Sequence, residues 1–170
     1  NVEFHYLHHR PDGGSYDDLA EMSARIAAAA QTTGIGLTLL PVAYQFGGLD
    51  QRPLGPGQRR FGNDPDRYAR LIDAADKALR PLPADTVLGV APHSLRAVSR
   101  ATLDRVAAMR PGPIHIHIAE QVAEVAEVQA AWGARPVEWA CANLPLDARW
   151  CMIHATQLTP QETAALARTG

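Results

Sequence analysis

Apolar residues follow two different periods along this chain, and the two periods alternate. Short runs with the alternation or the continuous apolar character of strands are followed by longer runs in which apolar residues recur every three or four positions, as in helices. Five strand-like runs are expected, at residues 2–9, 35–44, 86–91, 114–119 and 150–154. The sequence therefore predicts repeated strand–helix units.

Polar residues and glycines mark where the predicted helices begin and end. Ser15, with Asp18 three positions later, predicts the start of the first helix, and Gly34 predicts its left-handed end. Later starts are expected at Asp64, at Ser99, near Val122, near Pro136 and at Thr159, which forms a capping box with Glu162.

Strands that alternate with helices indicate right-handed crossovers and a parallel sheet. No glycine-rich phosphate-binding fingerprint follows any strand, which counts against a nucleotide-binding open sheet. The alternative is a (β/α)8 TIM-type barrel, which usually needs about 250 residues. The fold class we predict is therefore α/β: an incomplete barrel of about five parallel strands with outer helices, formed by residues 1–170 as one partial domain. The chain starts at Asn1, inside a strand-like run, so we expect an excerpt whose N- and C-terminal parts are missing.

Composition narrows the function classes. The net charge is −2 and the hydrophobic content 46%, with no basic face, so nucleic acid is not an expected partner. Apolar runs are far shorter than a membrane span, and no signal peptide opens the chain, so we expect a cytoplasmic protein. A small-molecule substrate is expected, and a homodimer is left open.

The seven histidines all fall in or just after predicted strands. In the central run, the alternation over 114–118 places His115 and His117 on one strand face, and Glu120 follows where the strand gives way to a helix. A histidine and a carboxylate at that offset can supply a metal ligand and a proton carrier to one cavity. Taken alone, the two histidines are equally well explained as satisfied core residues, and Glu120 as a first-turn residue favoured by the helix dipole. The segment 45–63, rich in Gly, Pro and Arg, predicts a functional or mobile loop.

These residues resemble the amidohydrolase superfamily, in particular its mononuclear deaminase branch. The motif His117-Ile118-Ala119-Glu120 and the later strand-end His154 carry the superfamily likeness. The segments Phe4–His9, Pro56–Phe61, Ala91–Arg96 and His115–Gln121 are more specific and are similar to those of the formimidoylglutamate deiminases. The resemblance covers nearly the whole chain, as barrel strands two to six.

The resemblance implies hydrolysis of N-formimino-L-glutamate to N-formyl-L-glutamate and ammonia, with one zinc ion as cofactor. It makes His117 a zinc ligand, Glu120 the general acid/base and His154 a partner of the attacking water. His93 and Arg96 would hold the substrate with help from Tyr6. Arg59 and Arg60 become substrate or cover candidates through the resemblance alone; otherwise they, like Arg96, are solvated charges.

Two elements of the family pattern are absent: the H-x-H pair of the first strand and the metal-binding Asp of the last strand. One histidine does not make a zinc site, because protein sites normally use three or four ligands. The 170 residues alone are therefore expected to be inactive. Two other functions stay open: a deaminase of the same superfamily that acts on a purine or pyrimidine type ring, and a non-catalytic half-barrel.

Overall fold

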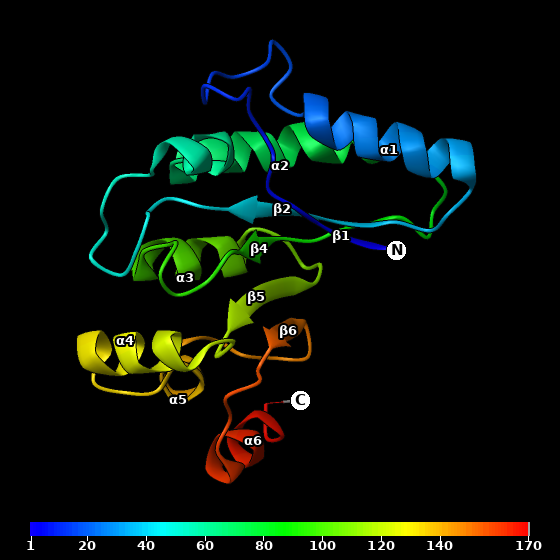
Figure 1. Cartoon of the computed structure of the whole chain (residues 1–170). Helices are drawn as coiled ribbons and strands as arrows, with labels where there is room; N and C mark the ends of the chain where they lie inside the picture. The colour runs from blue at the N-terminus through cyan, green and yellow to red at the C-terminus, as the bar shows by residue number, and fades with distance from the viewer. Residues whose placement is uncertain (170) are drawn as a thin grey trace.

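The computed structural model describes residues 1–169 and has the predicted alternation of strands and helices (Figure 1). In chain order the elements are β1 (Val2–His5), α1 (Glu21–Thr33), β2 (Thr38–Ala43), the 3₁₀ helix η1 (Pro56–Phe61), α2 (Pro65–Leu79), β3 (Val87–Leu88), β4 (Ala91–Pro92), α3 (Arg100–Ala108), β5 (Ile114–Ile118), α4 (Val122–Trp132), α5 (Pro136–Asn143), β6 (Trp150–His154) and α6 (Pro160–Leu166). No helix among these residues is both long and apolar enough to cross a membrane.

All strand pairs are parallel, and the strands lie in chain order. β1 pairs with β2, β2 pairs with both β3 and β4, and β5 pairs with β6 over five residues. Parallel bridges from Val90 to Ile114 and from Ser94 to His117 join the two halves. The predicted parallel order is confirmed, and the chain has an α/β fold.

The third predicted strand, at residues 86–91, is interrupted in the structure. It forms two short pieces, β3 and β4, with Gly89 between them. The Pro113 carbonyl and the Leu40 side chain lie against the Cα atom of Gly89, where a side chain would not fit. The glycine thus lets the neighbouring strands approach closely, which is needed where a sheet bends.

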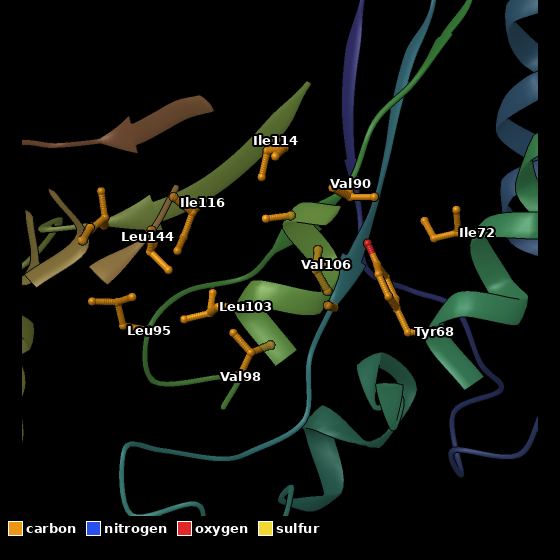
Figure 2. Packing of buried hydrophobic residues seen from close by; sticks show 14 of the residues in the cluster. Tyr68, Ile72, Val90, Leu95, Val98, Leu103, Val106, Ile114, Ile116 and Leu144 are labelled. Carbon is orange, nitrogen blue, oxygen red and sulfur yellow. The ribbon is translucent and has the colours of Figure 1, made fainter. Parts of the chain in front are cut away.

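The two faces of the sheet carry different residues. The larger core lies between the sheet and the helices; in Figure 2 the side chains of Ile114 and Ile116 lie in one layer with Leu103, Val106 and Tyr68. A smaller apolar cluster lies on the opposite face of β2, where Leu40 and Val42 alternate with Leu39 and Ala43 of the larger core. It contains Leu40, Val42, Tyr44, Ala91 and Ala97, and Phe4 and Phe61 pack against it. The alternation along β5, with buried isoleucines and half-buried histidines, follows the same division.

Several predicted helix boundaries are confirmed and one is wrong. Asp64, Ser99 and Thr159 accept backbone N–H bonds at the starts of α2, α3 and α6. The first helix begins at Glu21 rather than after Ser15. Asp18 instead accepts from the backbone N–H of Ala20 in a turn, and the Ser15 hydroxyl lies against the guanidinium of Arg67. These polar groups are used in the loop before the helix, so they do not cap it.

Two predicted strands are shorter than expected at one end. β1 ends at His5, and the residues after it turn toward segment 45–63, where the backbone N–H groups of His8 and His9 both donate to the Arg60 carbonyl. β2 begins at Thr38, while Ile35 remains 54% exposed. An apolar run alone therefore overestimated how far the sheet pairing extends.

Candidate active site at the carboxyl ends of the strands

Three of the predicted site residues meet at the carboxyl ends of β5 and β6. The imidazole of His117 stacks on that of His154, with 5.0 Å between ring centroids and 22° between ring planes. The Glu120 Oε2 atom lies 3.6 Å from His154 Nε2. The side chain of Glu120 is 45% exposed and that of His154 is 37% exposed, so a small molecule could reach both. The three groups therefore converge at one end of the sheet, and their chemical roles stay predictions.

The backbone is strained at the same place. Ala119, His154 and Ala155 have positive φ angles of 51°, 68° and 47°, a region that residues with a side chain seldom adopt. Such strain costs roughly 1–3 kcal/mol per residue and concentrates at functional sites, where surrounding contacts maintain it. Here the Ala119 carbonyl accepts from the backbone N–H groups of Thr156 and Gln157, which ties the two strand ends together.

Glu124, in the first turn of α4, holds the turn that carries Glu120. Its Oε1 accepts from the Ala119 N–H at 3.0 Å, and its Oε2 accepts from the Glu120 N–H at 2.9 Å. A carboxylate that accepts two backbone bonds fixes the peptide planes on both sides of residue 119. The direction of the Glu120 side chain therefore depends on Glu124.

His93 lies next to His117 and completes a row of three imidazoles. Their ring centroids are 5.1 Å apart, and Phe4 packs edge-on against His117 at 4.3 Å. Burial, followed by the nearby His117 and Arg96, lowers the pKa of His93 to about 3. Burial, together with His154, also lowers the pKa of His117, although Glu120 acts in the opposite direction. Both rings are therefore neutral at pH 7, the form in which imidazole can accept a proton or bind a metal.

Arg96 lies near this row and has no carboxylate partner among residues 1–169. Its Nη1 donates to the hydroxyl of Tyr44 at 3.1 Å. The ring of Tyr44 in turn packs against His93, with 4.6 Å between centroids. A half-buried guanidinium held by a neutral oxygen keeps its charge available for an anion.

Segment 45–63 lies at the carboxyl end of the sheet. In Figure 1 it runs along the side toward which the arrow of β2 points. Phe61 of η1 packs against Tyr6, at 4.9 Å between centroids, and against Tyr44, at 5.6 Å. Tyr6, predicted to assist substrate binding, is 41% exposed beside this contact. The predicted mobility of the segment is not tested by these contacts and stays a prediction.

The two neighbouring arginines of η1 have different surroundings. Arg60 donates from Nε to the carbonyl of His9 at 3.0 Å, so it fastens η1 to the loop after β1. Arg59 is exposed and lines a cavity of about 420 Å³ together with Asp12, Asn63 and Asp64. Arg59 therefore remains the freer of the two for a ligand.

The remaining histidines lie outside this row. His5, His8 and His9 are buried, and His8 and His9 donate from Nε2 to the carbonyls of Val42 and Gly62. These contacts give His8 and His9 a structural role in holding the loop after β1. His115 lies on the same strand face as His117, opposite Cys151 in the register.

Known proteins are similar to this chain in sequence and fold. No family model matches the chain. A curated formimidoylglutamate deiminase of Pseudomonas aeruginosa is 48% identical over 99% of the chain, which spans 37% of that relative's length. The crystal structure of an amidohydrolase from Brucella melitensis superposes with a TM-score of 0.96 and 53% identity, over 99% of this chain and 38% of that one. Over nearly its whole length the chain is therefore similar to proteins of the amidohydrolase superfamily. An adenosine deaminase from Xanthomonas campestris with bound zinc has a TM-score of 0.70 and 25% identity, over 86% of this chain and 32% of that one.

The superfamily likeness raises the question whether these residues suit a metal ion. His117 suits the role of a ligand, because its ring is neutral at pH 7 and its buried Nδ1 atom has no hydrogen-bond partner. No group of three or more histidine, cysteine or carboxylate side chains within residues 1–169 could hold a metal. The chain therefore offers one ligand and the proton-carrying groups beside it, and not a complete metal site.

Three residues of the candidate site were not predicted from the sequence: Phe4, Tyr44 and Glu124. Phe4 and Tyr44 stand in predicted strands, and no motif in the sequence assigns either side chain to the site. Glu124 follows Gln121 at the spacing of a capping box, and this signal in the sequence could have identified it.

Proposed function

We propose that the protein containing this chain hydrolyses N-formimino-L-glutamate to N-formyl-L-glutamate and ammonia, a step of histidine degradation. The observation that carries the substrate class is Arg96: a half-buried guanidinium with no carboxylate partner among the described residues, close to His93 in the row of imidazoles. Such a group suits a substrate with a carboxylate. The 48% identity to a formimidoylglutamate deiminase over nearly the whole chain supports the same substrate.

The chain's residues suit the steps of this hydrolysis. Glu120 is placed to take a proton from water as the water oxygen attacks the formimino carbon, and to deliver a proton to the departing nitrogen. His154, 3.6 Å from Glu120, would hold the same water from the other side. His93 and Arg96 would bind the substrate, and Tyr6 would close the site beside them.

Zinc would be held in part by His117 and would supply a Lewis acid for the activation of water. The zinc in the similar adenosine deaminase supports this assignment. Further ligands, such as a first-strand H-x-H pair and a last-strand Asp, would be needed in addition to the residues described. In this proposal the five strands are strands two to six of a (β/α)8 barrel, in which catalytic groups lie at the carboxyl ends of the strands. A cytoplasmic location and a homodimer remain predictions.

A second candidate is a deaminase of ring substrates, favoured by the likeness to the adenosine deaminase. The test is ammonia release by the full-length protein from N-formimino-L-glutamate and from adenosine, measured side by side. We expect turnover of the first substrate only. Turnover of adenosine alone would replace the proposed substrate, and a protein that binds no metal and turns over neither would support a non-catalytic half-barrel.

A further inference from the structure

We propose that Tyr44 is the positioning residue for Arg96 and couples it to segment 45–63. This inference rests on the proposed function, because it concerns how a carboxylate-bearing substrate is bound. Tyr44 directly follows β2, and its side chain is only 3% exposed. Its hydroxyl oxygen accepts two hydrogen bonds at 3.1 Å, one from Arg96 Nη1 and one from Gln58 Nε2.

Tyr44 suits this role because its hydroxyl carries no charge. A carboxylate in its place would orient Arg96 equally well, but it would also neutralise the guanidinium and compete with the substrate. The hydroxyl occupies one of the five N–H donors of arginine, so the others remain available. Tyr44 thus fixes the direction of the charge without reducing it.

Gln58 fixes the tyrosine from the other side. It belongs to η1, and its Oε1 accepts from the backbone N–H of Gly55 at 2.9 Å, so both ends of its amide are used. The ring of Tyr44 is held between His93 and Phe61, at 4.6 and 5.6 Å between centroids. A relay from Gln58 through Tyr44 to Arg96 therefore connects η1 to the substrate-binding guanidinium.

The test compares steady-state kinetics of the full-length wild-type protein and its Tyr44→Phe variant on N-formimino-L-glutamate. Phenylalanine keeps the ring contacts and removes only the hydroxyl. The variant removes the hydroxyl that accepts from the Arg96 guanidinium, so KM should rise about ten-fold. The reacting groups are untouched, so kcat should stay within about two-fold of the wild-type value. Gln58→Ala breaks the same relay from the other end, so it should raise KM in the same direction by a smaller factor, and it tests the proposal even if Tyr44→Phe does not fold.

Two tyrosine variants serve as controls. Tyr16→Phe removes a hydroxyl outside the site and should leave both constants unchanged; Tyr16 contacts Arg10 through its ring face. Tyr68→Phe removes a buried hydroxyl that donates to the Pro41 carbonyl at 2.7 Å, so it should lower the melting temperature without raising KM. A folded Tyr44→Phe variant with wild-type KM, or one that loses kcat alone, would overturn the positioning role. A wild-type protein without formimino hydrolysis would instead overturn the proposed function.

Discussion

Acid should destabilise this fold through buried histidines that bind no proton in the native state. Burial lowers the pKa of His5 to about 4 and, together with neighbouring positive charge, lowers the pKa of His8 and of His93 to about 3. In the unfolded chain the ordinary pKa is 6.5. Between these values only the unfolded chain binds the proton. The contribution of each ring is therefore complete above pH 6.5 and is lost as the pH falls toward its folded pKa.

The size of the effect follows from the pKa differences. One pKa unit corresponds to about 1.4 kcal/mol. As the pH falls from 6.5 to 4, each ring should therefore lower the free energy of unfolding by roughly 3 kcal/mol. Three rings together approach the whole stability of a typical domain, about 5–15 kcal/mol. In this interval each ring should contribute a slope of about 1.4 kcal/mol per pH unit to the free energy of unfolding.

The assay is urea unfolding of the full-length protein from pH 7 to pH 4.5, with His8→Gln as the perturbation. Glutamine can still donate to the Val42 carbonyl, which His8 contacts at 2.9 Å, but it binds no proton. The slope of unfolding free energy against pH should therefore fall by about 1.4 kcal/mol per pH unit. Tyr68→Phe, the matched buried control, should lower the free energy equally at every pH. Equal slopes in wild type and His8→Gln would refute the reasoning.

Three further variants separate substrate capture, metal binding and orientation of the turn. Arg96→Met should reduce kcat/KM for N-formimino-L-glutamate by roughly 30-fold or more, because it removes the charged partner of the carboxylate; full activity in steady-state assays would move the substrate to the ring class. His117→Ala should lower zinc per chain, measured by elemental analysis, because it removes a ligand, and full occupancy would argue against that role. Glu124→Gln should reduce kcat about ten-fold with zinc unchanged, because a neutral amide holds the Ala119 and Glu120 N–H groups less firmly; an unchanged kcat would show that the turn does not need the carboxylate.

The order of the strands and the meeting of His93, His117, Glu120 and His154 were predictable because both follow from local rules. Parallel strands joined by right-handed crossovers lie with their carboxyl ends at one edge, and side chains that follow strands must gather there. Alternation along β5 then fixed which face carries the histidines. None of these steps requires knowledge of a distant contact.

The parts that could not be predicted depend on contacts between distant residues. Tyr44 belongs to the site only because Arg96, 52 positions later, reaches its hydroxyl. Ser15 does not cap α1 because Arg67, 52 positions later, lies against its hydroxyl. Asp18 forms a local turn instead, and this turn delays the helix to Glu21. Such competition among partners for one polar group is decided by the fold and leaves no periodic signal in the sequence.

The most direct test of the proposed chemistry is ammonia release from N-formimino-L-glutamate by the full-length Glu120→Gln variant, with zinc content determined on the same sample. Glutamine keeps the size and shape of the side chain that lies 3.6 Å from His154, but it cannot carry a proton. We predict that turnover is abolished while zinc per chain stays at the wild-type value, because Glu120 is not proposed as a ligand. Turnover at the wild-type rate would contradict the assignment of Glu120 as the proton carrier.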